Sequence, residues 1–465
     1  MLRLGRRVVR MAVAIARADE APTPARLLAE HLGPEAPSLP VVSEGWATYD
    51  HVNLQGALER WTQAPGRSTT LVGLTNFQHS MFTLADLAQP AVFMHGPGVG
   101  AVAMARLASG PGGATRACVR CGLYLVSDGE ARLALLLREG DPHRGQDQTT
   151  VEVLCADSDR AAAVLGEIRR LALQHSVFRG QLLSFDSEMF GPRDAPLSFH
   201  ERPALTRESL VLPAGVLEAV EAQVVGVARH RTRLVASGQH LKRGVLLHGP
   251  PGTGKTHTLR YLMSLLTDTT VVMLSGDALQ FIAAAVSIAR ALQPAVVIVE
   301  DVDLIAEDRD MYPGQHPLLF QLLNEMDGLG EDADVTFLLT TNRVDLLEPA
   351  LAQRPGRVDQ AVELPLPDAD GRRRLLALYR GKLNLQLTDT DPIVAKTEGM
   401  TASFFKELLR RAALISAERA DRDGHGALEV GDAELHAALD QLLAERNQLT
   451  RILLGARRED RPPAP

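Results

Sequence analysis

The segment at residues 249–256, GPPGTGKT, constrains the fold of this chain more than any other feature. It matches the phosphate-binding loop (P-loop) pattern G-x-x-x-x-G-K-[ST]. An apolar run at residues 244–247 precedes it, as expected of a strand, and a helical stretch at residues 257–266 follows. A strand, a glycine-rich loop and a helix in this order predict a nucleoside triphosphate site at the end of the strand.

Each residue type in this loop has a chemical reason. Glycines let backbone N–H groups turn toward a phosphate, and the N-terminus of the following helix adds a partial positive charge. Lys255 can reach the β- and γ-phosphates, and the Thr256 hydroxyl can ligate Mg²⁺. We therefore expect ATP and Mg²⁺ as cofactors. The predicted nucleotide-binding residues are Gly249, Pro250, Pro251, Gly252, Thr253, Gly254, Lys255, Thr256 and His257.

Length and composition set broad limits. A chain of 465 residues is too long for one hydrophobic core, so several domains are expected. The formal net charge of −8 argues against a general nucleic-acid binder. No apolar run is long enough to span a membrane, and residues 1–20 lack the features of a cleaved leader. We expect a cytoplasmic protein.

The cysteines are too few for a disulfide framework. Cys118 and Cys121 have the C-x-x-C spacing of a zinc site, which Cys155 and His143 could complete. A second C-x-x-C pair is missing. A reduced pair in a strand is therefore the preferred interpretation, and zinc is the alternative.

The N-terminal part of the chain predicts an α+β domain at residues 41–205. It mixes short strands with an amphipathic helix at residues 158–174 and ends in a connector at residues 178–207. Residues 1–40 before it predict a helix followed by a proline-rich linker at residues 33–40.

The C-terminal part predicts an α/β nucleotide-binding domain with a helical lid. Residues 206–366 alternate strands with helices, which predicts a parallel sheet covered on both faces. Residues 367–447 are wholly helical in pattern and form the lid, and residues 448–465 have the composition of a disordered tail. The expected fold class is a P-loop NTPase sheet with a helical lid, preceded by the α+β domain.

Two carboxylates end the apolar strand predicted at residues 295–299. ATP hydrolysis needs one group that holds Mg²⁺ and another that activates the attacking water. By position Glu300 would bind the metal and Asp301 would activate the water. The order Asp-Glu is commoner, so the assignment of the two roles stays open.

Three further polar residues fit the same chemistry. Asn342 follows an apolar strand at residues 335–340, where an amide beside the γ-phosphate can hold the lytic water. Arg354 and Arg357 flank a Pro-Gly turn and suit a finger that a neighbouring subunit receives. The alternative for these two arginines is an ordinary exposed turn.

In this order and spacing, the segments KRGVLLHGPPGTGKT, VVIVEDVD, LLNEMDGL, TTNRVDLLEPAL and RPGRVD resemble the AAA ATPase module of the AAA+ superfamily. The resemblance covers about residues 207–445. It implies ring assembly, usually hexameric, with Asn342 as sensor 1 and Arg354 and Arg357 as arginine fingers. Residues 397–402 resemble the lid segment near adenine.

The chain also departs from the usual AAA pattern. The aromatic-hydrophobic-Gly sequence of a pore loop is missing, although Phe281 could lie near a pore. The short segment before Glu300, the Glu-Asp order and the lead-in LVLPAGVLEAV resemble the branch that contains the mitochondrial chaperone that translocates the Rieske protein.

From these features we expect an ATP-hydrolysing homo-hexamer that remodels, disassembles or translocates a protein client selected by residues 41–205. The alternatives are a nucleic-acid-linked ATPase of the loader or helicase kind and a nucleotide-gated scaffold. The acidic balance and the aromatic content of 4% count against nucleic acid. The set Lys255, Glu300, Asp301, Asn342 and Arg357 counts against a scaffold with little turnover.

Overall fold

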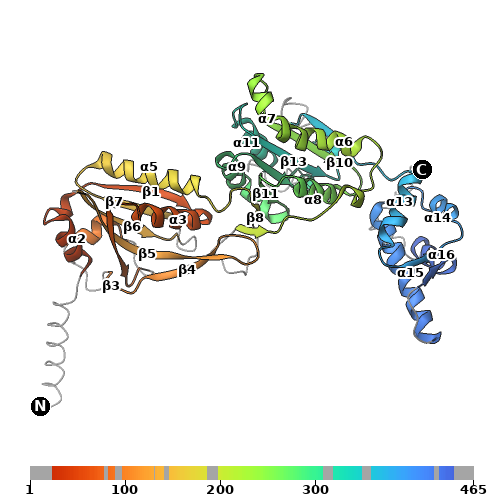
Figure 1. Ribbon diagram of the computed structural model, residues 1–465, viewed down its shortest axis with the longest axis horizontal. Helices are drawn as coiled ribbons and strands as arrows, with labels where there is room; N and C mark the ends of the chain where they lie inside the picture. The colour runs from red at the N-terminus through yellow and green to blue at the C-terminus, as the bar shows by residue number, and fades with distance from the viewer. Residues whose placement is uncertain are drawn as a thin grey trace, which may run out of the picture. The chain divides into compact units, whose positions relative to one another are not determined.

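The computed structural model describes residues 23–77, 82–89, 97–129, 131–140, 146–185, 197–306, 318–347, 358–423 and 429–444. The chain forms two compact units (Figure 1). The first is Met1–Arg179 with Glu188–Phe199, and the second is Gly180–Ser187 with His200–Pro465. The domain boundary predicted at residues 205/206 therefore lies inside the second unit.

The first unit is built on a seven-stranded sheet. Its strands follow the order β1 (Val41–Ala47), β7 (Gln148–Leu154), β6 (Ala131–Arg138), β5 (Thr115–Asp128), β2 (Arg67–Leu74) and β3 (Val99–Gly100), with β4 (Ala103–Ala108) also paired to β5. All of these pairings are antiparallel. Strands β3 and β4 are separate, since β3 pairs with β2 and β4 pairs with β5.

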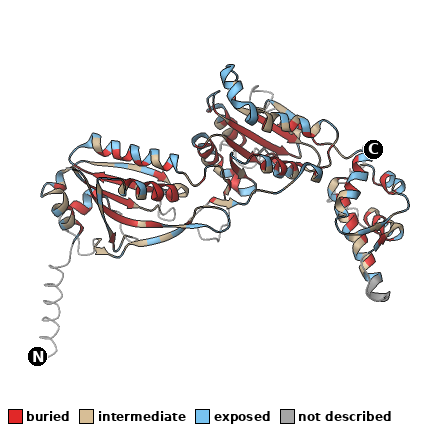
Figure 2. Cartoon of the chain, viewed as in Figure 1, coloured by how far each residue is buried: buried red, intermediate tan, exposed pale blue. Residues whose placement is uncertain are grey.

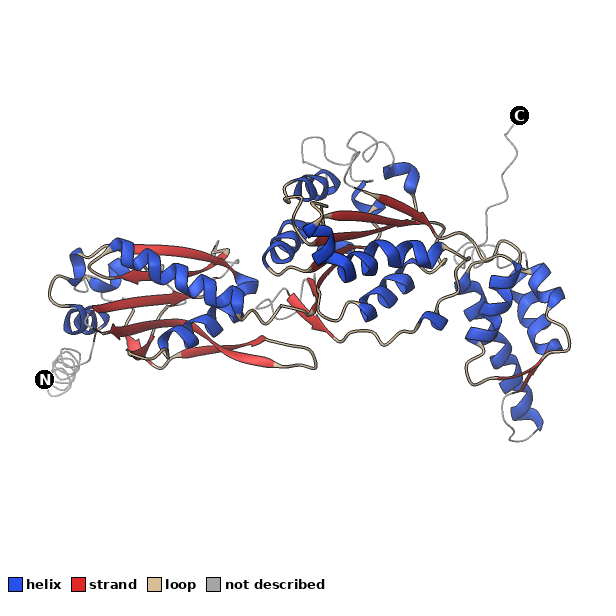
Figure 3. Cartoon of the chain, turned by 45° about the horizontal axis from the view of Figure 1, so that its top comes forward, coloured by secondary structure: helices blue, strands red, loops and turns tan. Residues whose placement is uncertain are grey.

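Helices cover both faces of this sheet (Figure 3). On one face α3 (His51–Thr62) and α5 (Ser158–Gln174) pack against Leu133, Leu135 and Leu137. On the other face α2 (Pro24–Leu32) and α4 (Leu84–Ala88) pack against Ala134 and Leu136. Alternate residues of β6 thus enter different cores, as the period of a strand requires. The α+β fold class predicted for this part is confirmed.

The linker predicted at residues 33–40 is packed against the first unit. Ala36 begins a short 3₁₀ turn, η1 (Ala36–Ser38), and is only 1% exposed within the same core as Leu28 of α2. Thr23 caps α2 by accepting a hydrogen bond from Arg26 N, and Pro24 occupies the first helical position. The prolines therefore lie at the starts of a helix and of a 3₁₀ turn, and the segment is packed.

The second unit is built on a parallel sheet, as predicted. Its strands follow the order β14 (Gln360–Glu363), β10 (Arg243–His248), β13 (Val335–Thr341), β12 (Ala295–Val299), β11 (Thr270–Leu274) and β8 (Leu182–Phe185). Every pairing from β14 to β8 is parallel. Strands β12 and β13 are buried along their whole length (Figure 2), as expected of strands covered on both faces.

Helices flank this sheet. Because they cover its strands, these strands are apolar. They are α6 (Val216–Glu221), α7 (Val227–Ala236), α8 (Lys255–Leu265), α9 (Ile282–Ala291), α10 (Asp303–Ala306) and α11 (Leu318–Asp327). The π-helical turn η5 (Ala222–Gly226) separates α6 from α7. Among the described helices of the whole chain, none combines the length and the apolar composition that a bilayer span needs.

The connector predicted at residues 178–207 contains a strand of the nucleotide-binding sheet, β8. Strand β8 pairs in parallel with β11, and its Phe185 stacks on Phe281 with ring centroids 4.9 Å apart and an interplanar angle of 16°. The apolar run of β8 is too short to be distinguished by pattern from a loop. Phe281, the candidate pore aromatic, is thus engaged with the edge of the sheet.

The lid is a helical bundle with a small sheet. Helices α13 (Ala369–Tyr379), α14 (Asp391–Lys396), α15 (Ala402–Asp423) and α16 (Asp432–Leu443) share a core around Phe404 and Phe405. Two short parallel strands, β15 (Asn384–Gln386) and β16 (Glu429–Gly431), join the bundle. The expectation of a wholly helical lid was wrong here, because each strand is only three residues long and leaves no alternating pattern.

The packing of β8 predicts a stability effect. Phe185 is 4% exposed, so Phe185→Ala should lower the free energy of unfolding of the second unit by about 3–5 kcal/mol, measured by urea denaturation. The matched control is Leu414→Ala on α15, where a side chain 51% exposed should cost less than about 0.5 kcal/mol. Equal losses for the two variants would contradict the place of β8 in this unit.

Candidate nucleotide site

The loop between β10 and α8 has a backbone that needs glycine. Gly249, Gly252 and Gly254 have φ angles of 147°, 79° and 105°, in the region that side chains disfavour. A Cβ on Gly249 would also lie 2.3 Å from Leu364 O. The strand, loop and helix predicted from the pattern are therefore present, with the loop closely apposed to the chain after β14.

Lys255 points back into this loop. Its Nζ donates to Gly249 O at 2.7 Å and to Pro250 O at 3.0 Å, and the residue is 7% exposed. Burial lowers the pKa of Lys255, whereas the negative charges of Asp301 and Asp303 raise it. The ammonium group thus lies between the loop that would hold phosphates and the carboxylates that follow β12.

Thr256 and His257, the predicted nucleotide-binding residues that follow Lys255, differ in their surroundings. Thr256 is exposed at the start of α8, where its hydroxyl can meet a metal ion. His257 is partly buried, and its Nε2 is 3.2 Å from Ser209 O, in the segment that leads to α6. His257 therefore ties α8 to that segment.

The ends of β12 and β13 meet because the two strands are parallel neighbours. Asn342 Nδ2 donates to Asp301 Oδ1 at 3.1 Å, which joins two residues predicted from separate motifs. Glu300 is partly exposed, and its backbone N donates to Leu274 O at 2.9 Å. The structure thus brings Lys255, Asp301 and Asn342 to one edge of the sheet.

Asp301 has a strained backbone. Its φ angle is +51°, and among the described residues other than glycine only Asn76 shares a positive φ. Its N donates to Thr340 Oγ1 at 3.0 Å, and its carbonyl accepts from Leu304 N at 2.9 Å. Such a conformation costs of order 1–3 kcal/mol and persists only where the surroundings hold it, as is common at functional sites.

Asp303 is a site residue that the sequence analysis missed. It is 8% exposed, and its Oδ1 accepts from Thr341 Oγ1 at 2.8 Å and from Asn342 N at 3.2 Å. The available signal was a third carboxylate two positions after Asp301. Arg354 and Arg357, in contrast, lie outside the described residues.

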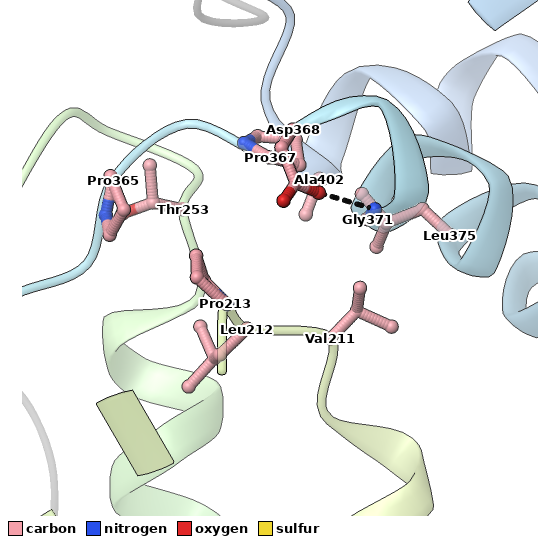
Figure 4. Close-up of a pocket in the computed structure, with 10 residues that line it drawn as sticks. All are labelled: Val211, Leu212, Pro213, Thr253, Pro365, Pro367, Asp368, Gly371, Leu375 and Ala402. Carbon is pink, nitrogen blue, oxygen red and sulfur yellow. Dashed lines mark hydrogen bonds between the residues drawn. The ribbon is translucent and has the colours of Figure 1, made fainter. Parts of the chain in front are cut away.

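A recess opens beside the loop, between the sheet and the lid (Figure 4). In this conformation the recess encloses about 10 Å³, which is room for about one water molecule. Asp368 Oδ1 accepts from Gly371 N at 2.7 Å and so caps α13 at one wall. The lining residues are Val211, Leu212, Pro213, Thr253, Pro365, Pro367, Asp368, Gly371, Leu375 and Ala402.

The lid also touches the loop itself. Ser403 N, in the first turn of α15, donates to Gly252 O at 3.4 Å. A Cβ on Gly252 would lie 2.9 Å from Ser403 Oγ and 3.0 Å from Thr401 Oγ1. The segment predicted to lie near adenine therefore reaches both the recess, through Ala402, and the phosphate loop.

The cysteines are free thiols in the first unit. Cys118, Cys121 and Cys155 are all buried. Burial raises the pKa of Cys118 and of Cys121 to about 12, which opposes the thiolate form that zinc requires. In the described parts of the chain, three or more His, Cys, Asp or Glu side chains nowhere gather into a group that could hold a metal ion. His143 lies outside those parts.

Comparisons with known proteins find similarity in the segment that contains this site. The profile of the family described as "ATPase family associated with various cellular activities (AAA)" matches residues 245–366. Proteasome-activating nucleotidase 2 of Halobacterium salinarum is 30% identical over 309 residues, which cover 63% of this chain and 72% of that relative. The chain belongs to the AAA family of ATPases. This AAA protein is therefore an ATP-hydrolysing enzyme.

Other relatives of this AAA protein are longer. ATP-dependent zinc metalloprotease FtsH 3 of Sphaerobacter thermophilus is 33% identical over 276 residues, 56% of this chain and 54% of the relative. FtsH of Mycobacterium tuberculosis is 32% identical over 256 residues, 52% of this chain and 33% of the relative. The chain thus spans about half, or less, of the length of these relatives. The likeness to the Rieske-protein translocase branch rests on the sequence motifs alone.

The place of Lys255 predicts the effect of its removal. Lys255→Ala should raise the Kd for a fluorescent ADP analogue at least about tenfold, because charge-assisted hydrogen bonds to phosphate are lost. Lys396→Ala, at an exposed lysine of the lid, is the matched control and should leave the Kd unchanged. An unchanged Kd in Lys255→Ala would show that the loop does not hold the nucleotide.

Proposed function

We propose that this AAA protein uses ATP hydrolysis to remodel, disassemble or translocate a protein client, as a homo-hexameric ring. The observation that carries the proposal is the meeting of Lys255, Asp301 and Asn342 at one edge of the parallel sheet. Open parallel sheets bind ligands outside the carboxyl ends of their strands, which is where these residues lie.

The residues divide the work of hydrolysis among them. Backbone N–H groups of residues 249–256 and the Lys255 ammonium would bind the β- and γ-phosphates. Asp301 would accept the proton of the attacking water, because its carboxylate is held by Asn342 at 3.1 Å and is exposed to solvent.

The chemistry of the donors also fits Mg²⁺. A hydroxyl and a carboxylate are ligands that this ion prefers, and Thr256 and Glu300 would supply them. Mg²⁺ held there would neutralise charge on the phosphates. The partly exposed Glu300 and the exposed Thr256 are both open to solvent, as such a site requires.

The recess supports a place for the base of the nucleotide. Its wall is mainly apolar, with Val211, Leu212 and Leu375 among its lining, and Thr253 of the phosphate loop borders it. Because the recess encloses only about 10 Å³ in this conformation, a purine would enter it only after the lid, which contributes Ala402 and Gly371, moves away from the sheet.

Two features support a protein client. The names of the relatives join nucleotide or ATP use to proteolysis, as a zinc metalloprotease and a proteasome activator. The first unit has its own core and is the proposed client-selecting part.

A zinc-protease activity is not proposed for this chain. His200 is the only histidine followed by glutamate in this sequence, and no H-E-x-x-H motif occurs.

Ring assembly would complete the site. Arg354 or Arg357 of one subunit would stabilise charge on the phosphoryl group held by its neighbour. Threading past Phe281 is not part of the proposal, because that ring is stacked on Phe185. Movement or disassembly of a folded client is equally compatible with the site.

The client class can be tested by stimulation of ATP turnover. A permanently unfolded protein, reduced and carboxymethylated α-lactalbumin, should raise the ATPase rate about twofold or more, because client binding and hydrolysis are coupled. Native α-lactalbumin is the matched control, and single- and double-stranded DNA are the competing activators. With ATP, mass photometry should show a particle of six times the chain mass of 50.3 kDa.

Saturable stimulation by DNA with none by unfolded protein would favour the nucleic-acid-linked alternative. A monomer that retains full turnover with ATP would contradict the shared site.

A further inference from the structure

Asp303 is a buried carboxylate at the edge of the nucleotide site, with no assigned role. Only 8% of it is exposed, and among the described residues no lysine, arginine or histidine forms an ion pair with it. A buried carboxylate is costly unless hydrogen bonds compensate for lost water. The donors that compensate here are the Thr341 hydroxyl and Asn342 N, at 2.8 and 3.2 Å.

Both donors lie at the C-terminal end of β13, because Thr341 is its last residue and Asn342 follows it. Thr341 Oγ1, which donates to Asp303, also accepts from Arg343 N at 2.9 Å. The hydroxyl therefore fixes the turn from two sides. Asp303 also accepts a hydrogen bond from Asn342 N. This bond fixes the backbone of Asn342, while its side chain stays partly exposed.

The side chain of Asn342 then reaches Asp301. Its Nδ2 donates to Asp301 Oδ1 at 3.1 Å. On the other side, Asp301 N donates to Thr340 Oγ1 at 3.0 Å and Val302 N donates to Thr340 O at 2.8 Å. The ends of β12 and β13 are thus joined by hydrogen bonds in both directions around the strained Asp301.

We propose that Asp303 is a positioning residue of this ATPase, whose carboxylate fixes the Thr341–Asn342 turn and thereby aims Asn342 at Asp301. The inference rests on the proposed role of Asp301 in activating water. Without the carboxylate, the Thr341 hydroxyl and Asn342 N would lose their acceptor, and the turn would be free to move the amide away from Asp301.

The variants separate positioning from folding. Asp303→Ala removes the acceptor of both hydrogen bonds, and Asp303→Asn keeps one oxygen that can accept them. Thr341→Val removes one donor with little change of shape, and Thr341→Ser restores the hydroxyl. Thr336→Val is the matched control, because Thr336 is a buried threonine of the same strand, 8% exposed, outside this network.

The measured quantities are kcat and KM for ATP and the Kd for a fluorescent ADP analogue. We expect Asp303→Ala to lower kcat roughly 10- to 100-fold, since a small misplacement of catalytic groups has effects of this size. The Kd should change less than about threefold, because the phosphate loop is intact. Asp303→Asn and Thr341→Val should lower kcat less than Asp303→Ala does. Thr341→Ser should keep most of the parental kcat, and Thr336→Val should have the kcat of the parent.

A double variant tests whether Asp303 acts through Asp301. In the Asp301→Asn background, adding Asp303→Ala should lower kcat by less than about threefold, because the group it positions has already been removed. Full multiplication of the two losses would overturn the proposal, as would a normal kcat in Asp303→Ala. If Asp303→Ala fails to fold, the proposal is tested with Thr341→Val and Asp303→Asn instead. A kcat equal to that of the parent in both of these variants would overturn the proposal.

Failure of the proposed function looks different. Normal turnover in Asp301→Asn would remove the role of Asp301 itself, whatever Asp303 does. A slow Asp301→Asn with a fast Asp303→Ala would keep the proposed function and reject only the positioning role.

Discussion

The parallel pairing of β10, β13 and β12 is the constraint on which the rest of the nucleotide site depends. Because parallel strands end at the same edge, residues from separate motifs, Lys255, Asn342 and Asp301, meet without any of them being close in sequence. The same pairing places the Thr340 hydroxyl against the backbone of Asp301. A shift of β13 by one residue would point its side chains to the other face and separate these groups.

This arrangement links stability and function at the same residues. The left-handed backbone of Asp301 is unfavourable by itself, and the hydrogen bonds to Thr340 and Asn342 hold it. The lid adds a second connection, since Ser403 N meets Gly252 O while Ala402 lines the recess. Nucleotide in the loop and recess would therefore contact both the sheet and the lid, which is a physical route from ATP binding to movement of the lid.

The sequence predicted the parts whose chemistry is local. Residues 249–256 match a loop pattern whose glycines suit positive φ angles, and the apolar run at residues 295–299 is long enough to be recognised as a buried strand. It did not predict β8, β15 or β16, because strands of three or four residues acquire their conformation from a partner strand and carry no pattern of their own. The recess was missed for a related reason. Val211, Pro365 and Gly371 have no chemistry that marks a site, and they come together only in the fold.

The central claim is that this edge of the sheet, with the adjoining recess, binds and hydrolyses ATP. The most direct measurement is a structure of the chain with Mg²⁺ and a non-hydrolysable ATP analogue. It should show the phosphates along residues 249–256, the base in the recess beside Ala402, and the γ-phosphate within hydrogen-bond reach of Lys255 and Asn342. Phosphates bound elsewhere, or a γ-phosphate remote from Asp301 and Asn342, would contradict the account.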